Sequence, residues 1–213
     1  RHARHELADA YFRGNASRWD EIRSMHVDDA EVEATLLTAL PYDRDKHLID
    51  IGTGTGRILE LMAGRVARSI GVDSSREMLA LARSRLDILK IRDCQVRQGD
   101  MYQLREVDAA FDIAILHQVL HYADDPTAVV IEAGRILAAG GILAIVDFAP
   151  HDVEELRGGH AHRRLGFGDK EIAGLFNDAD MQTIETRELP GDPLTVKIWV
   201  GRKLAKGDIT AAA

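Results

Sequence analysis

Apolar positions along this chain fall into two alternating patterns. The segment 47–51 (His-Leu-Ile-Asp-Ile) is a short apolar run that ends in a cluster of glycines, and Ile58, Leu59, Met62 and Val66 follow it with helical spacing. A short apolar run bounded by glycine is typical of a buried strand, and a 3.6-residue apolar period is typical of a helix that buries one face. The sequence therefore predicts a strand, a tight turn and a helix whose apolar face includes Val66.

The same unit recurs further along the chain. Strands are predicted at 69–73, 94–99, 111–116 and 142–148, and helices with one apolar face at 78–89 and 129–137. Strands that alternate with helices predict right-handed crossovers and a parallel sheet that is covered on both faces.

The C-terminal part has a different pattern. A predicted helix at 172–179 is followed by extended runs at 181–189 and 195–200, separated only by Pro190-Gly-Asp-Pro193. Such a connection is too short for a crossover helix, so the two runs are expected to pair antiparallel. The predicted fold is a doubly wound α/β domain on a seven-stranded sheet, with six parallel strands and one antiparallel strand in a C-terminal hairpin.

A helical segment that ends at Pro41 precedes the first strand. We assign residues 1–45 to a helical N-terminal appendage and 46–206 to the main domain. Residues 207–213 have no apolar period, and we expect a disordered tail there. The chain begins at Arg1, and the sequence leaves open whether a further domain lies upstream.

Composition and charge narrow the class of protein. Of the 213 residues, 46% are hydrophobic and 29% are charged, which is typical of a globular domain. No run of about 18 apolar residues predicts a membrane span. The net charge of −8 disfavours binding of nucleic acid by this segment alone. Cys94 is the single cysteine and no signal peptide is evident, so we expect a cytoplasmic location.

The glycine cluster Asp50-Ile-Gly-Thr-Gly-Thr-Gly56 lies between the first predicted strand and the first predicted helix. A glycine-rich turn there lets a nucleotide ligand approach the backbone, and its alternative role is that of a tight turn only. A dinucleotide fingerprint would place its third glycine at position 57, which is Arg57 in this chain. The spacing therefore disfavours a nicotinamide cofactor.

Asp73 closes the second predicted strand. A carboxylate at this place can accept hydrogen bonds from both hydroxyls of a ribose. The alternative is an acidic residue that stabilises the start of the next helix, beside Ser74 and Ser75.

These residues resemble class I S-adenosylmethionine-dependent methyltransferases. The resemblance covers roughly residues 48–200, and besides the glycine loop and Asp73 it includes Gln98-Gly-Asp-Met101, the segment 111–121 and the segment 137–141. It implies a Rossmann-like methyltransferase fold and S-adenosyl-L-methionine or S-adenosyl-L-homocysteine as the cofactor. It further implies transfer of a methyl group to a small-molecule acceptor, which the sequence does not identify.

The resemblance also implies a set of cofactor-binding residues. These are Asp50, Gly52, Gly54, Gly56, Asp73, Ser74, Met78, Gly99, Asp100, Met101, His117 and Gln118. In this assignment the glycine loop faces methionine and ribose, Asp100 accepts the adenine amino group, and His117 and Gln118 lie beneath the sulfonium. Asp100 has an alternative role as a turn cap, and Met78 an alternative role as a core residue.

A narrower resemblance is to the methyltransferase-like domain of bacterial ArsR-type regulator fusions. It rests on the strings 19–26, 117–122, 146–151 and 160–167. It implies an upstream DNA-binding domain in the full-length chain and an alternative function, that of a non-catalytic domain that senses S-adenosylmethionine or S-adenosylhomocysteine. A homodimer is also left open.

Methyl transfer requires proximity, desolvation and, for a weak nucleophile, a general base. His117 and His121 are the candidate catalytic residues, because both are expected near the carboxyl ends of the central strands. We predict no metal site. Tyr11 and Trp19 in the appendage resemble residues of a short lid over the cofactor, with packing against the sheet as the alternative.

Overall fold

The computed structural model describes residues 28–154, 156 and 162–205. Tyr11, Trp19, most of the predicted appendage and the predicted tail lie outside these ranges. Within them one sheet contains the strands β1 (His47–Ile51), β2 (Arg68–Asp73), β3 (Cys94–Gln98), β4 (Phe111–His117), β5 (Leu137–Phe148), β6 (Met181–Leu189) and β7 (Val196–Lys203).

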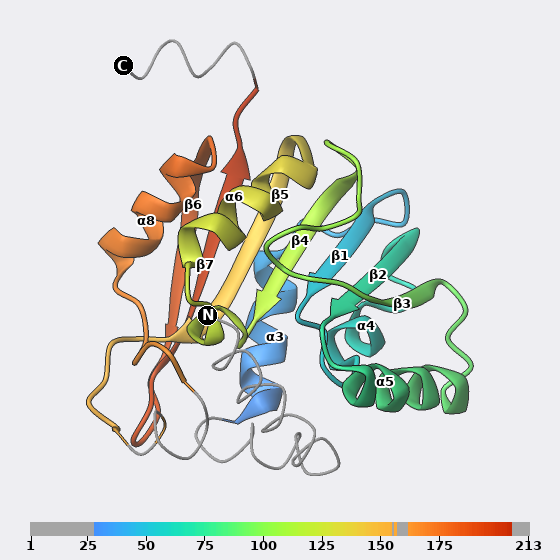
Figure 1. Ribbon diagram of the computed structural model, residues 1–213, viewed down its shortest axis with the longest axis horizontal. Helices are drawn as coiled ribbons and strands as arrows, with labels where there is room; N and C mark the ends of the chain where they lie inside the picture. The colour runs from blue at the N-terminus through green and yellow to red at the C-terminus, as the bar shows by residue number, and fades with distance from the viewer. Residues whose placement is uncertain (1–27, 155, 157–161, 206–213) are drawn as a thin grey trace.

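The strands follow the order β3-β2-β1-β4-β5-β7-β6 (Figure 1). The first five strands pair in parallel, and β7 is antiparallel to both β5 and β6. Six strands therefore share one direction and β7 opposes them. This confirms the predicted doubly wound fold with its C-terminal hairpin.

Helices cover both faces of the sheet (Figure 1). They are α3 (Asp29–Ala39), α4 (Arg57–Met62), α5 (Arg76–Ile88), α6 (Pro126–Ile136) and α8 (Asp169–Asp178), with the short 3-10 turn η2 (Leu120–Tyr122). One core cluster joins α6 and α8 to the sheet, and a second joins α3 and α4 to the opposite face. Because β4 is covered on both faces, it has a nearly continuous apolar sequence.

Local signals in the sequence account for the helix starts. Ser75 caps α5, since its Oγ accepts a hydrogen bond from the Met78 N–H at 3.2 Å. Asp125 caps α6 in the same way, and Pro126 occupies the first turn, where its missing N–H costs nothing. The Ser75 cap lies directly after the carboxyl end of β2, which is where a ligand site is expected in this fold, and the Asp125 cap follows η2.

Among the predicted boundaries, two were wrong for a clear physical reason. The helix after the glycine loop ends at Met62, and Gly64 with a φ of +70° turns the chain before Val66. The segment 137–141 was expected to be the end of a helix and a turn, but it is the first part of β5, because Leu137 pairs with Phe111. The register of the β4–β5 pairing shifts between Phe111 and Ile113, and Gly140 has a φ of +78°.

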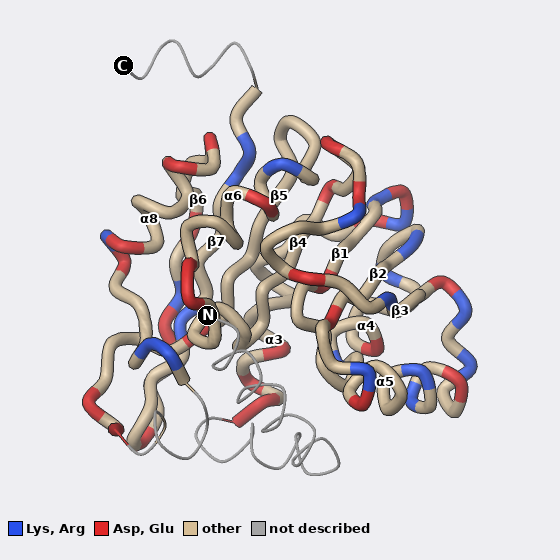
Figure 2. Tube along the Cα trace, viewed as in Figure 1, with Lys and Arg blue, Asp and Glu red and all other residues tan. Residues whose placement is uncertain are grey.

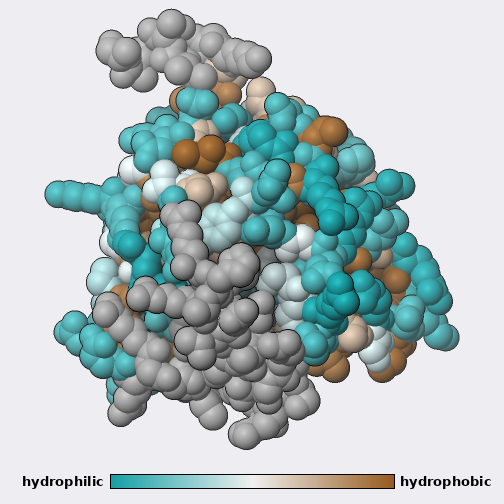
Figure 3. Space-filling view, in the orientation of Figure 1, coloured by the Kyte–Doolittle hydropathy of each residue, from teal (hydrophilic) through white to brown (hydrophobic). Residues whose placement is uncertain are grey.

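The surface is that of a globular domain. Figure 3 shows a viewed face that is mostly hydrophilic with small, separate hydrophobic patches, and Figure 2 shows charges of both signs along α5. None of the helices in the described ranges is long and apolar enough to span a membrane.

Candidate functional site: a pocket at the carboxyl ends of the strands

The glycine loop connects β1 to α4 and depends on left-handed backbone angles. Gly52, Gly54 and Gly56 have φ values of +76°, +54° and +80°. The N–H groups of Gly52 and Thr53 donate to the Val72 carbonyl at 2.8 and 3.0 Å, which fixes the loop against β2. A Cβ at Gly52 would lie 2.4 Å from Val119 Cγ2, so a side chain is excluded there.

Gly56 has a different role from the other two glycines. A Cβ on Gly56 would lie 3.1 Å from the Ala82 Cβ on α5, and Gly56 does not line the pocket. This glycine therefore allows close packing between the loop and α5. Its predicted contact with the cofactor stays a prediction.

Asp73 joins the glycine loop to the start of α5. Its Oδ2 accepts the Gly54 N–H at 2.8 Å and its Oδ1 accepts the Ser75 N–H at 2.9 Å. The helix-start role and the ligand role are compatible, because a carboxylate has about four lone-pair sites. Asp50, 1% exposed, accepts the Thr53 hydroxyl at 2.6 Å and stiffens the loop from inside.

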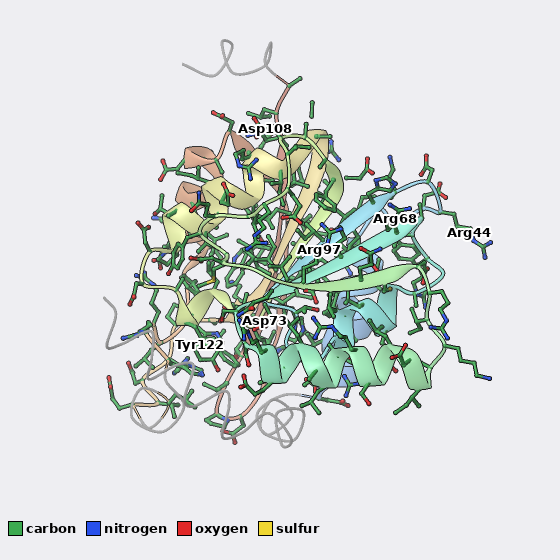
Figure 4. The ribbon with its side chains drawn as sticks, turned by 45° about the vertical axis from the view of Figure 1, so that its right-hand side comes forward. Arg44, Arg68, Asp73, Arg97, Asp108 and Tyr122 are labelled. Atoms are coloured by element: carbon green, nitrogen blue, oxygen red, sulfur yellow. The ribbon has the colours of Figure 1, made fainter. Side chains whose placement is uncertain are left out.

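The glycine loop and the ends of β2 and β4 surround a pocket. In Figure 4, Asp73 and Tyr122 lie at this end of the sheet, and Arg68 lies at the opposite end. The lining contains every predicted cofactor-binding residue except Gly56, namely Asp50, Gly52, Gly54, Asp73, Ser74, Met78, Gly99, Asp100, Met101, His117 and Gln118.

The end of β4 forms one wall of this pocket. His117 and Gln118 are each 8% exposed, and the Gln118 N–H donates to the Val146 carbonyl at 2.7 Å. Gln118 has a φ of +51°, a conformation that is uncommon outside glycine and that is concentrated at functional sites.

The end of β3 forms the opposite wall. Asp100 Oδ1 accepts the Tyr102 N–H at 2.9 Å, so the turn-capping role of Asp100 is present and its carboxylate also lines the pocket. Burial raises the pKa of Tyr102, whose hydroxyl accepts the Asp124 N–H at 2.8 Å. Met78 is 2% exposed, so it belongs to the core and contributes to the lining as well.

Several lining residues were not predicted from the sequence. They are Ile51, Thr53, Thr55, Arg57, Ile58, Val72, Tyr102, Val119, Tyr122, Asp124 and Arg163. Those within or directly after the glycine loop could have been found from their neighbours. Tyr122 and Asp124 had no such signal, because tertiary contacts bring them to the pocket.

His121 does not line the pocket and is 1% exposed. Its Nδ1 lies 2.8 Å from Asp147 Oδ1, and its backbone N–H donates to Asp147 Oδ2 at 3.2 Å. The same carboxylate accepts the Phe148 N–H at 2.8 Å. Asp147 is fully buried, and its carboxylate accepts hydrogen bonds from three donors at the ends of β4 and β5.

His121 holds a more distant segment in place. Its carbonyl accepts the N–H groups of Arg163 and Arg164 at 2.9 and 3.2 Å, and its ring lies 4.0 Å from that of His162, centroid to centroid. Arg163 lines the pocket, and its Nε lies 3.5 Å from Asp124 Oδ1. His117 therefore lines the pocket, and His121 is connected to it indirectly, through Arg163.

Across the described ranges, no group of three or more His, Cys, Asp and Glu side chains has a metal-binding arrangement. Cys94 lies on β3, away from the pocket, and burial raises the pKa of its thiol to about 11.

The fold is Rossmann-like, and the pocket lies at the carboxyl ends of its strands. Residues 49–145 match the family described as "Methyltransferase domain". The matched region includes the glycine loop, Asp73 and His117. The match agrees with the predicted class of protein, the methyltransferases.

Individual relatives agree with this match. The uncharacterized methyltransferase YcgJ of Bacillus subtilis is 30% identical over 109 residues, which are 51% of this chain and 43% of that protein. A ubiquinone biosynthesis O-methyltransferase of Thiobacillus denitrificans is 28% identical over 166 residues, 70% of each chain. The crystal structure of YcgJ has a TM-score of 0.74 at 20% identity and covers 83% of this chain and 99% of that one.

This chain covers between 32% and 43% of the length of four curated relatives. The structural likeness, at 20% identity, shows the fold.

Proposed function

We propose that this chain binds S-adenosylmethionine in the pocket at the carboxyl ends of β1, β2 and β4 and transfers its methyl group to a small-molecule acceptor. The observation that carries the proposal is the contact between Asp73 and Gly54. It places the carboxylate expected to bind ribose directly against the glycine loop expected to hold the methionine end. The match of residues 49–145 to the methyltransferase domain family supports the same reaction.

The pocket offers chemically suitable groups to each part of the cofactor. Asp73 has acceptor sites for the ribose hydroxyls, and Asp100 with the Met101 backbone faces the position proposed for adenine. His117 and Gln118 lie at the end of β4, where the sulfonium is proposed to sit. The buried Asp50 adds a carboxyl group to the lining near the same end.

The chain contributes to the reaction mainly by orientation and exclusion of water. Methyl transfer is an in-line displacement at the carbon bound to sulfur, so an acceptor atom must approach from the side opposite the sulfur. His117 is the proposed general base, because its side chain lines the pocket and imidazole titrates near neutral pH. The proposed acceptor wall consists of Tyr122, Asp124 and Arg163.

The relatives support a small acceptor. One is named a ubiquinone biosynthesis O-methyltransferase, which is an activity on a small molecule. The alternative function, a sensor domain next to a DNA-binding domain, uses the same pocket and differs in which form of the cofactor it prefers.

Calorimetric titration of the chain with S-adenosylmethionine and with S-adenosylhomocysteine tests the proposal, with NAD as the control nucleotide. We expect both sulfur nucleosides to bind and NAD to give no signal. Absence of binding by both sulfur nucleosides would overturn the proposal. A preference of about a hundredfold for S-adenosylhomocysteine, near 2.7 kcal/mol, would favour the sensor.

A further inference from the structure

Arg57 lies at the junction of the pocket with α3. It is the first residue of α4, follows the glycine loop directly, and lines the pocket. Its Nε donates to Glu33 Oε1 and its Nη2 to Glu33 Oε2, each at 2.7 Å. This paired contact fixes the plane of the guanidinium as a single hydrogen bond would not.

Further charged groups brace Arg57 from α4 and α5. Its Nη1 lies 2.9 Å from Glu60 Oε1, and the other oxygen of Glu60 lies 3.9 Å from Arg85 Nε. Arg85 Nη1 donates to the Thr55 hydroxyl at 3.3 Å. The pKa of Arg57 is raised, first by its hydrogen bonds with Glu33, so its positive charge is secure. Two carboxylates therefore hold a permanent cation at the edge of the glycine loop.

The contacts of Arg57 leave part of its donor capacity available. A guanidinium has five N–H groups, and the contacts with Glu33 and Glu60 use three of them. Among the described residues that line the pocket, the cationic side chains are those of Arg57 and Arg163. Arg163 is next to Asp124 on the acceptor wall, whereas Arg57 adjoins the glycine loop.

We propose that Glu33 and Arg57 act together as a selector for ligands that carry an amino-acid group. Arg57 binds the α-carboxylate of the cofactor, and Glu33 is the positioning residue that orients the guanidinium. This inference rests on the proposed function. Because Glu33 belongs to α3, occupancy of the pocket and the position of α3 are energetically coupled, and the coupling acts equally in both directions.

Two nucleosides separate this role from a general effect on the loop. S-adenosylhomocysteine carries the α-carboxylate, and 5′-methylthioadenosine has the same adenosine and thioether without the amino-acid group. We expect Arg57→Met to weaken S-adenosylhomocysteine binding by roughly 10- to 100-fold and to change methylthioadenosine binding by less than about twofold. Glu33→Gln should weaken only S-adenosylhomocysteine binding, by roughly 3- to 10-fold.

Arg85→Met is the matched control. Arg85 belongs to the same charged network but does not line the pocket, so both affinities should stay within about twofold of the original chain. Thermal unfolding of each variant identifies a folding defect, and Glu33→Gln provides the test if Arg57→Met does not fold.

The outcomes distinguish the two proposals. If Arg57→Met lowered the affinity for both nucleosides equally, or for neither, the selector role would be overturned. Failure of the original chain to bind S-adenosylhomocysteine would overturn the proposed function itself.

Discussion

The two halves of the pocket are built in different ways. The half formed by the glycine loop and Asp73 depends on left-handed glycines and on backbone hydrogen bonds from β1 to β2. The half formed by β4 and β5 depends on Asp147, which joins His121 to Phe148 and so supports the segment that carries Arg163. The backbone conformation defines the first half, and buried side-chain contacts define the second.

This difference predicts different weaknesses. In the glycine-loop half, an added methyl group does the damage, because the backbone angles and close approaches exclude a side chain. In the β4–β5 half, the loss of one carboxylate does the damage, because several buried donors share it. Four experiments examine this comparison, and the expected effects become smaller from one to the next.

Asp147→Ala should cause the largest loss of stability. It removes the acceptor of three buried donors, the His121 Nδ1–H and the N–H groups of His121 and Phe148. We expect the free energy of unfolding to fall by about 3–5 kcal/mol in denaturant titrations. Asp147→Asn, which retains one oxygen acceptor, should lose less. A loss below about 1 kcal/mol for the alanine variant would show that this half does not depend on the carboxylate.

In the glycine-loop half, Gly52→Ala should cause the largest loss of stability from an added methyl group. Alanine is strained at a φ of +76°, and its Cβ would meet both Val119 Cγ2 at 2.4 Å and Val119 Cβ at 2.8 Å, on a side chain with little rotational freedom. We expect a loss of about 2–4 kcal/mol in unfolding free energy.

Gly64→Ala is the control for this substitution. Gly64 has a φ of +70° and no heavy atom within 4 Å of an added Cβ, so only the backbone strain of about 1 kcal/mol should appear. Equal losses for the two variants would mean that contact with Val119 contributes nothing.

Asp73→Ala should affect binding more than folding. The substitution removes an acceptor for the ribose hydroxyls and leaves the N–H groups of Gly54 and Ser75 at a partly open site, where water can replace the carboxylate. We expect S-adenosylhomocysteine affinity to fall by about 1–3 kcal/mol in calorimetry, without unfolding of the domain. An unchanged affinity would remove Asp73 from the site.

The same division explains how far the sequence could predict the molecule. The fold and the glycine-loop half could be predicted, because periodicity and glycine spacing are local and Asp73 follows directly from the end of β2. The β4–β5 half could be predicted only as far as His117 and Gln118. No local pattern indicates that Asp147 binds His121, or that Arg163 reaches the pocket through the His121 carbonyl.

The start of β5 illustrates the same limit. The residues 137–141 have the composition of a turn, and Leu137 continues the apolar face of α6. Pairing with β4 nevertheless recruits this segment into the sheet, because Leu137 lies opposite Phe111. A long-range partner thus outweighed the local preference.

The smallest expected effect concerns acid stability next to the β4–β5 half. Lys197 is opposite Asp147 in the sheet and donates to Asp169 Oδ2 at 2.8 Å, and this hydrogen bond, with one from Trp199, lowers the pKa of Asp169. A lowered pKa in the folded state means that the ionised Asp169 stabilises the fold above about pH 4, and that this contribution is lost as the pH falls through the folded-state pKa.

Asp169→Asn should therefore reduce the free energy of unfolding at neutral pH and leave it less dependent on pH below about 4. Because the Asp169 side chain is 57% exposed, solvent screens the ion pair and the difference should not exceed about 1 kcal/mol. S-adenosylhomocysteine affinity at pH 7 should stay unchanged, since neither Asp169 nor Lys197 lines the pocket. A variant that lost affinity together with stability would show that the hairpin links the two halves of the pocket mechanically, so that the halves are not independent.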